Sequence, residues 1–352
     1  MDSRQRILTA LDHREADRVA IDDSPWQSTV ARWHREGLPE GVSPAEHFGY
    51  EMVPISCNMT PRFPVETLEE TDEYVIERTA TGAINKNFRD FSTTPGLVDR
   101  PIKSREDWPP IRDRLCPDET RGNWDGLRRQ VERARRQGKF IVFRSAYGYD
   151  GLQAYMRSDQ LLMAMATDPD WVREMVMTLA NLTVEMVKMA IERGIEFDGF
   201  WSFNDMGYRN GLLFSPHTYR LTQREADAMV FSFAHEHGKP VFLHSCGNVA
   251  ELIPDLIEMG LDCLQPLEVK AGMDLIELKK RYGDRLAFMG GIDVRAMAAE
   301  DPAVIEEEIA SKLEVAKAGG GYIYHSDHSV PKNVSFEQYR RVIELVLKYG
   351  RY

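Results

Sequence analysis

The chain of 352 residues is poor in cysteine, in long apolar runs and in positive charge. Its four cysteines, at positions 57, 116, 246 and 263, are too few and too scattered for a disulfide framework, so we expect reduced thiols. No run of about 18 apolar residues predicts a transmembrane helix, and the opening Met-Asp-Ser-Arg-Gln-Arg is not typical of a signal peptide. These absences predict a soluble, cytoplasmic protein with no membrane partner.

Acidic residues outnumber basic ones by 56 to 44, which gives a formal net charge of −12. Nucleic-acid binding depends on Lys and Arg side chains that neutralise phosphates, so we exclude it. The first predicted strand is followed by neither a Gly-x-Gly-x-x-Gly nor a Gly-Lys-Ser/Thr motif, which removes support for a dinucleotide-binding or P-loop fold. We therefore expect a small-molecule substrate.

Short strand patterns alternate with helical patterns along most of the chain. Strands are predicted at residues 18–22, 139–143, 198–203, 241–243, 262–267, 286–289 and 322–324. This rhythm predicts a parallel sheet, and seven or eight such units favour an α/β fold of the (β/α)8 TIM-barrel type over an open doubly wound sheet. We expect residues 1–352 to form this single domain.

Residues 24–120 interrupt the rhythm with many prolines and isolated aromatic residues. Two strands are predicted within this region, at 74–79 and 82–88. We expect the region to be an elaboration that covers the barrel at one end, and not a second catalytic domain.

Polar side chains gather at the carboxyl ends of the predicted strands, where barrels of this type carry their chemistry. A random arrangement would scatter them along the chain, so we predict an active site at this rim. The set comprises Asp22 and Asp23, Arg144, Asn204 and Asp205, His244 and Cys246, Gln265 and Glu268, Asp293, and His325 to His328.

The segment 240–248, Pro-Val-Phe-Leu-His-Ser-Cys-Gly-Asn, places His244 and Cys246 two residues apart at a strand end. Side chains at i and i+2 of a strand point to the same side, so the imidazole and the thiol can converge. This pair suits zinc better than a hard cation, but a third ligand must come from elsewhere. For the pair alone, the alternative is a buried cysteine beside a hydrogen-bonded histidine.

Four motifs resemble the uroporphyrinogen decarboxylase superfamily: His-Ser-Cys-Gly-Asn from 244, Ile-Pro-Asp-Leu-Ile-Glu-Met-Gly-Leu-Asp from 253, Gly-Gly-Ile-Asp from 290 and Asp-His-Ser-Val-Pro from 327. That superfamily also contains cobalamin-dependent methyltransferases that act on methyl groups from methanol, methylamines and methoxyaromatics. The resemblance covers residues 140–350 well and the first 120 loosely. It implies a (β/α)8 barrel.

Porphyrin decarboxylases carry an N-terminal Trp-Leu-Met-Arg-Gln-Ala-Gly-Arg-type stretch whose arginines hold the tetrapyrrole carboxylates. The corresponding residues 24–33 read Ser-Pro-Trp-Gln-Ser-Thr-Val-Ala-Arg-Trp and lack clustered arginines, so uroporphyrinogen is not the expected substrate. The methyltransferases bind zinc at a similar His-x-Cys-Gly motif, with a cysteine after the last strand as third ligand. Sliding that pattern onto this chain places His328 in the position of the cysteine.

The resemblance thus implies a zinc site of His244, Cys246 and His328. Glu268 and Asp327 are the substitutes for His328, and Cys263 is less suited because it begins its strand. A site with one thiolate has a net charge of about +1, and the more positive zinc is a stronger Lewis acid toward an ether, hydroxyl or carboxylate oxygen.

We therefore expect a zinc-dependent, corrinoid-linked methyltransferase of the O-demethylase type. It would move a methyl group from a small O-methyl or related substrate to the corrinoid (cobalamin) of a separate protein, because this chain has no covalent cobalamin motif. The candidates for orienting a zinc ligand or handling a proton are Asp205, Asp327 and Glu268.

The candidates for substrate binding are Arg144, Asn204, Asp293 and Tyr147. For Arg144 the alternative is an ion pair with a neighbouring acid, and for Asp293 it is the cap of the following helix.

The competing function is a decarboxylase or lyase on a small carboxylate other than uroporphyrinogen, which Arg144 and the missing second thiolate favour. A binding barrel without catalysis fits less well with so many titratable groups at the rim. Members of the resembling family often dimerise, so we expect a homodimer.

Overall fold

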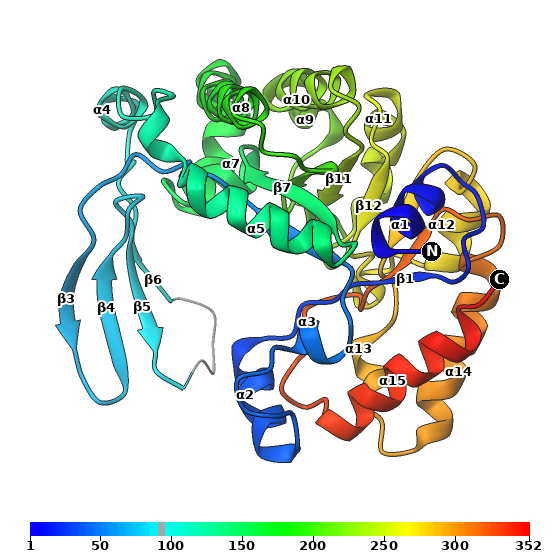
Figure 1. The fold of residues 1–352 in the computed structure, drawn as a ribbon. Coiled ribbons are helices and arrows are strands. Elements are labelled where there is room, and N and C mark those ends of the chain that lie inside the picture. The colour runs from blue at the N-terminus through cyan, green and yellow to red at the C-terminus, as the bar shows by residue number, and fades with distance from the viewer. Residues whose placement is uncertain (91–95) are drawn as a thin grey trace.

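The computed structural model describes residues 1–90 and 96–352, and its centre is a curled sheet of eight parallel strands (Figure 1). Their order in the sheet is β1-β14-β13-β12-β11-β8-β7-β2, which follows the chain around a ring. Helices surround the strands, so the predicted (β/α)8 barrel is confirmed. The strands are β1 (Ala20–Ile21), β2 (Met52–Ile55), β7 (Phe140–Ala146), β8 (Gly199–Phe203), β11 (Val241–His244), β12 (Cys263–Gln265), β13 (Ala287–Met289) and β14 (Tyr322–Tyr324).

The helices begin at side-chain caps that the sequence supplies. The longest, α8, starts where Asp168 accepts the backbone N–H of Trp171, with Pro169 at its first position, and α15 starts with a capping box of Ser335 and Gln338. In residues 1–90 and 96–352, no helix combines the length and the apolar character needed to span a bilayer. The helices are α1 (Ser3–Leu11), α2 (Gln27–Glu36), α3 (Pro44–His47), α4 (Trp108–Arg112), α5 (Trp124–Arg136), α6 (Tyr149–Gln153), α7 (Ser158–Thr167), α8 (Pro169–Glu192), α9 (Pro216–Thr222), α10 (Arg224–Glu236), α11 (Ile253–Glu258), α12 (Leu275–Tyr282), α13 (Val294–Met297), α14 (Pro302–Ala316) and α15 (Phe336–Tyr349).

Strand β2 is the barrel strand that the sequence analysis does not identify. It has four residues, lies inside the irregular region 24–120, and contains Pro54, which has no N–H to give to a ladder. Its pairing with β7, from Met52 opposite Phe140 to Ile55 opposite Phe143, makes it a barrel strand. Tertiary pairing here overrides a weak local pattern.

The barrel interior changes from apolar to polar within one step along the strands. An apolar cluster fills the lower interior; it includes Ala20, Met52, Phe140, Val142, Trp201, Phe242, Cys263, Ala287, Met289 and Ile323. A polar residue stands two positions after five of these apolar residues, so its side chain points to the same side of the strand. After Ala20, Val142, Phe242, Cys263 and Ile323, these polar residues are Asp22, Arg144, His244, Gln265 and His325. A polar layer therefore rests on a dry core and forms the floor of the barrel mouth.

Region 24–120 contains an antiparallel sheet of β3 (Glu66–Glu70), β4 (Tyr74–Arg78), β5 (Ile84–Phe88) and β6 (Gly96–Asp99). Strands β4 and β5 coincide with the two predicted there. Figure 1 shows this sheet standing beside the barrel, outside the ring of helices. Ala45 and Tyr50, from the segment between α2 and β2, line the barrel mouth. That the whole region covers one end of the barrel stays a prediction.

The seam between β1 and β2, the two ends of the sheet, is closed by Glu51. One backbone hydrogen bond crosses it, from Glu51 N to Ile21 O at 2.8 Å. The Glu51 carboxylate, which is 1% exposed, accepts the N–H of Ile21 at 3.0 Å and forms ion pairs with Arg18 at 2.6 Å and with Arg6. A buried carboxylate thus replaces part of the missing ladder.

We expect Glu51→Gln to lower the free energy of unfolding by roughly 3 kcal/mol, because it leaves the buried Arg6 and the half-buried Arg18 short of a counter-charge. Urea unfolding would measure the loss. The matched control is Glu337→Gln, which breaks an exposed ion pair with Arg340 and should cost less than about 1 kcal/mol. Equal losses in the two variants would contradict the role of Glu51 in the seam.

Candidate functional site

A cavity of about 370 Å³ lies at the carboxyl ends of the barrel strands. The polar layer forms its floor, and the rings of Trp201 and Phe203 from β8 form part of its wall. This volume is at the lower end of the range of about 300–1,000 Å³ that small-molecule sites occupy. The lining residues are Asp22, Asp23, Ser24, Ala45, Tyr50, Met52, Pro54, Arg144, Trp201, Phe203, His244, Gln265, Pro266, His325, His328 and Ser329.

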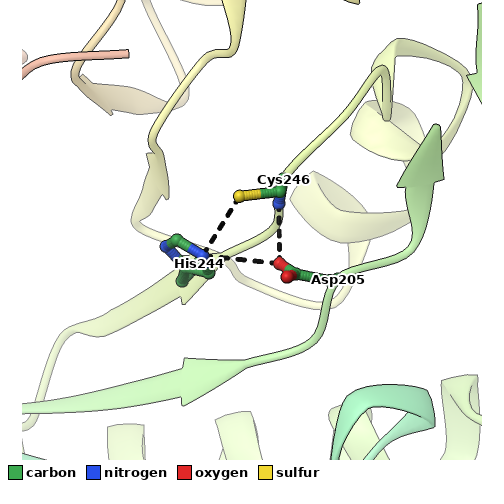
Figure 2. A group of neighbouring side chains, drawn as sticks. All are labelled: Asp205, His244 and Cys246. Atoms are coloured by element: carbon green, nitrogen blue, oxygen red, sulfur yellow. Dashed lines mark hydrogen bonds and ion pairs between the residues drawn. The ribbon is translucent and has the colours of Figure 1, made fainter. Parts of the chain in front are cut away.

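Asp205, His244 and Cys246 form a group of three candidate metal ligands at the ends of β8 and β11 (Figure 2). One ligand atom of each lies within 4.8 Å of the other two. The Nε2 atom of His244 lies 3.4 Å from Sγ of Cys246 and 3.4 Å from Oδ1 of Asp205. Within residues 1–90 and 96–352, no other group of His, Cys, Asp and Glu meets this condition.

The donor set of this group fits zinc. An imidazole nitrogen, a thiolate and a carboxylate oxygen give the three protein ligands that catalytic zinc sites use, with the fourth position left open. Zinc–ligand bonds of about 2.0–2.3 Å at tetrahedral angles place the ligand atoms roughly 3.3–3.6 Å apart. The two measured separations of 3.4 Å agree with that spacing.

Neighbouring polar groups hold the three side chains in place. His244 Nδ1 donates to Oε1 of Gln265, which leaves the Nε2 lone pair directed at Cys246 and Asp205. Asp205 Oδ1 in turn accepts the backbone N–H of Cys246 at 2.8 Å. The imidazole is therefore set in the tautomer that a metal requires.

Two glycines let the loops that carry the ligands approach each other. Gly247 has a φ of +76°, and a Cβ there would lie 2.2 Å from the carbonyl carbon of Gly207. A Cβ on Gly207 would lie 2.6 Å from the backbone nitrogen of Asn248. The N–H of Gly207 donates to the carbonyl oxygen of Cys246 at 3.2 Å. Glycine in the His-x-Cys-Gly segment thus allows close backbone contact between the β8 and β11 loops.

Burial shifts the pKa values of His244 and Cys246 in opposite directions. Desolvation lowers the pKa of His244, although the charge of Asp205 opposes the shift, so the neutral imidazole that can bind a metal is favoured. Desolvation raises the pKa of the Cys246 thiol well above its usual range, and the carboxylates of Asp205 and Glu268 add to the effect. The thiolate form would therefore need a cation at this point, which a metal ion would supply.

Gln265 connects the metal group to a second histidine. Its Nε2 lies 3.3 Å from Nε2 of His325, whose Nδ1 donates to the carbonyl oxygen of Ser326 at 2.6 Å and lies 3.6 Å from Asp23. Asp23 is itself fixed by the hydroxyls of Ser326 at 2.5 Å and Tyr339 at 2.8 Å. His325 is thus held at the cavity floor by a rigid polar network.

The residues predicted as the third ligand lie outside the metal group. His328 lines the cavity, but its ring stacks on Trp26 with centroids 6.1 Å apart. Glu268 accepts the N–H of Gly247 at 2.7 Å and pairs with Lys270 at 2.9 Å. Asp327 accepts two backbone N–H groups, from residues 269 and 294, at 2.9 and 3.0 Å. The geometry favours Asp205 over all three.

Of the four predicted substrate-binding residues, Arg144 alone lines the cavity. The amide of Asn204 accepts from the N–H of residue 150 at 3.2 Å and donates to Gln223 at 2.9 Å. Asp293 caps α13 and pairs with a neighbouring arginine, which was the alternative for it. Tyr147 is fully buried and lies away from the cavity lining.

Three residues of the cavity floor had no assigned role in the sequence analysis: Asp22, Gln265 and His325. A signal for them exists, because each stands two residues after an apolar side chain that the barrel interior buries. Their place at the rim was predicted, but assigning each a role requires the register of every strand, which β1 and β12, with two and three residues, leave undefined in the sequence.

The protonation of Asp22 gives a pH-dependent prediction. Burial raises its pKa to about 7, from 3.8, against the attraction of Arg144. Because the folded pKa is the higher one, wild-type stability from this group is present below about pH 4 and falls as pH rises toward 7. Asp22→Asn keeps an acceptor for the N–H of Met52 but never ionises. We expect it to gain stability over wild type, increasingly from pH 5 to pH 8, by a few kcal/mol at most.

Calorimetric unfolding across that pH range would test this expectation. The control is Asp72→Asn in the exposed turn between β3 and β4, which should show no such trend. A difference between Asp22→Asn and wild type that does not change with pH would contradict the prediction.

Metal content tests the ligand set. We expect about one zinc per chain, lost in His244→Ala, Cys246→Ala and Asp205→Ala, because two ligands hold zinc far more weakly than three. His328→Ala is the matched control, since it removes a cavity histidine outside the group, and it should keep its zinc. Zinc retained without Asp205 but lost without His328 would show that the sequence pattern, and not this geometry, identifies the third ligand.

Comparison with known proteins places the chain in a family. The sequence profile described as uroporphyrinogen decarboxylase (URO-D) matches residues 122–349. The uroporphyrinogen decarboxylase of Pectobacterium carotovorum subsp. carotovorum is 30% identical over 112 residues, which are 32% of this chain and 30% of that protein. That of Salinispora tropica is 26% identical over 187 residues, 52% of this chain and 46% of that protein. The matched segments thus span less than half of these relatives.

Among solved structures, a methyltransferase from Methanosarcina mazei superposes with a TM-score of 0.67 and covers 99% of both chains. At 15% sequence identity this likeness concerns the fold alone. The profile match extends over more than half of the chain and includes the metal group and, of the cavity floor, Arg144, Gln265 and His325. The chain therefore belongs to the uroporphyrinogen decarboxylase (URO-D) family.

Proposed function

We propose that this protein is a zinc-dependent methyltransferase of the O-demethylase type, which transfers a methyl group from a small O-methyl substrate to the corrinoid of a separate protein. The observation that carries the proposal is the group of Asp205, His244 and Cys246 beside a cavity of about 370 Å³. The fold shared with a methyltransferase supports it. A zinc ion held there would act as a Lewis acid on a substrate oxygen.

The donor set makes proton supply important. Two anionic ligands and a neutral imidazole give a net charge of about zero, against about +1 for the set with His328. The weaker Lewis acid leaves more of the developing charge on the leaving oxygen to be neutralised by a proton. His325 lines the cavity, but its Nδ1 donates to a carbonyl and its Nε2 accepts from the amide of Gln265 at 3.3 Å, so the proton would come from solvent at the cavity mouth.

The step balances without a further reactant from this chain. The bond between the methyl carbon and the oxygen breaks, and its electron pair stays on the oxygen, which takes a proton from solvent. The methyl group passes to the acceptor, which supplies the electron pair of the new bond. The role of this chain is to place the substrate oxygen near the metal group.

A porphyrinogen substrate is not favoured by the cavity. Its volume of about 370 Å³ suits a small molecule, while a tetrapyrrole with eight carboxylates needs several arginines. Arg32, the arginine in residues 24–33, lies on α2 and pairs with Glu36 at 2.6 Å, outside the cavity lining.

The second candidate function is a decarboxylase or lyase that acts on a small carboxylate. The observation that favours it is Arg144, a cation in the cavity wall to which a carboxylate would bind. This candidate needs no methyl acceptor and releases carbon dioxide or an eliminated group.

One experiment separates the two candidates. Zinc-loaded protein would be incubated with reduced cobalamin as acceptor and with a panel of small methyl ethers and carboxylic acids, while methyl-cobalt absorbance and carbon dioxide are recorded. We expect methyl transfer without carbon dioxide, abolished in His244→Ala and lowered about 10- to 100-fold in Gln265→Ala, which loses the partner of the ligand imidazole. Glu337→Gln, on the surface of α15, should match wild type.

Carbon dioxide without methyl transfer would move the decarboxylase to first place. A zinc-loaded protein that shows neither reaction with any compound of the panel would overturn the proposed function.

A further inference from the structure

We propose that Arg144 is an anchor for a carboxylate, and that the cavity takes small, flat carboxylic acids. This inference deepens the proposed function, on which it rests for the reaction, because it names the class of substrate. It stands on the surroundings of one side chain: its missing partners, the rings beneath it, and its position relative to the metal group.

Arg144 is buried without the partners that other buried arginines have. Its Nε has no hydrogen-bond partner, and no carboxylate of the described residues forms an ion pair with it within 4.0 Å. By contrast, Arg121 donates to four backbone carbonyls at 2.6–2.9 Å, and Arg6 pairs with Asp17 and Glu51. A buried charge without partners is costly, so a group from outside the chain is the expected partner.

Asp22 interacts electrostatically with Arg144 but forms no ion pair with it within 4.0 Å. Its Oδ1 accepts the backbone N–H of Met52 at 3.2 Å, at the seam of the barrel. A direct ion pair would hold the carboxyl ionised, whereas burial raises the pKa of Asp22 to about 7. The guanidinium therefore keeps its donors for a ligand that enters the cavity.

The aromatic wall selects a flat ligand. The guanidinium lies over the ring of Trp201 at 4.9 Å and over that of Phe203 at 5.6 Å. The contact with the two rings restricts the movement of the guanidinium, and an arginine held in this way can bind a carboxylate through two parallel hydrogen bonds. The same rings offer an apolar surface to the body of the ligand.

The position of Arg144 relative to His244 sets the length of the ligand. Strand β8 lies between β7, which carries Arg144, and β11, which carries His244. Two strand spacings separate the two backbones by roughly 10 Å. Both side chains line the cavity, and the ring of Phe203 lies 5.6 Å from the guanidinium carbon and 5.2 Å from the imidazole centroid. A flat ligand that packs against this ring would have its carboxylate at Arg144 and its reacting oxygen near His244.

Binding of benzoate and benzamide to the whole zinc-loaded protein tests the anchor, because the two molecules have the same flat shape and differ in charge. We expect calorimetry to give a dissociation constant about 10- to 100-fold lower for benzoate than for benzamide. Arg144→Gln should remove this preference. The matched control is Arg133→Gln on the surface of α5, which should keep it.

Equal affinity of wild-type protein for the two compounds, or binding of neither, would overturn the inference whether or not the Arg144 variant folds. A preference for benzoate that persists in Arg144→Gln would overturn it as well. The test involves no turnover, so it is separate from the proposed function. A carboxylate preference in a protein without methyl transfer would leave the anchor standing and refute the reaction, and methyl transfer from neutral ethers only would do the reverse.

Discussion

The alternation of side chains along the barrel strands is the constraint on which the site depends. The same strands that bury Val142, Phe242 and Cys263 in the core raise Arg144, His244 and Gln265 into the mouth two residues later. Because the core beneath is dry, the floor of the cavity has little solvent to stabilise charge. Desolvation accordingly lowers the pKa values of Arg144 and His244 and raises that of Asp22. Each polar group of this layer needs a partner within the layer, or from a ligand above it.

The metal group follows from how two loops satisfy this requirement. Asn204, which is fully buried, is fixed by Gln223 and by the backbone of residue 150, so the chain leaves β8 on a defined path. The next residue, Asp205, is thereby presented to His244 and Cys246 of the neighbouring strand. These contacts make Asn204 a support for the backbone that carries Asp205, and its predicted substrate-binding role stays a prediction.

The sequence allows part of this site to be predicted, and the limits have physical causes. The barrel and the pair of His244 and Cys246 could be read from local patterns, because strand periodicity acts within a few residues. The proximity of Asp205 to this pair could not, since it depends on the contact of two loops 40 residues apart, across Gly207 and Gly247. The expectation of His328 came from a motif of related sequences, which gives order along the chain and not distance in space, and it stays a prediction.

The carboxylate anchor bears on the choice between the two candidate reactions. Arg144 stabilises a bound carboxylate in the ground state, and decarboxylation of that same group disperses the charge to which the guanidinium is complementary. Binding that is stronger in the ground state than in the transition state slows a reaction. In methyl transfer the carboxylate takes no part, so Arg144 can position the substrate while the change in charge occurs near His244 and His325. An anchor at one end of the cavity and the metal group at the other thus favour chemistry at the end of the ligand remote from its carboxylate.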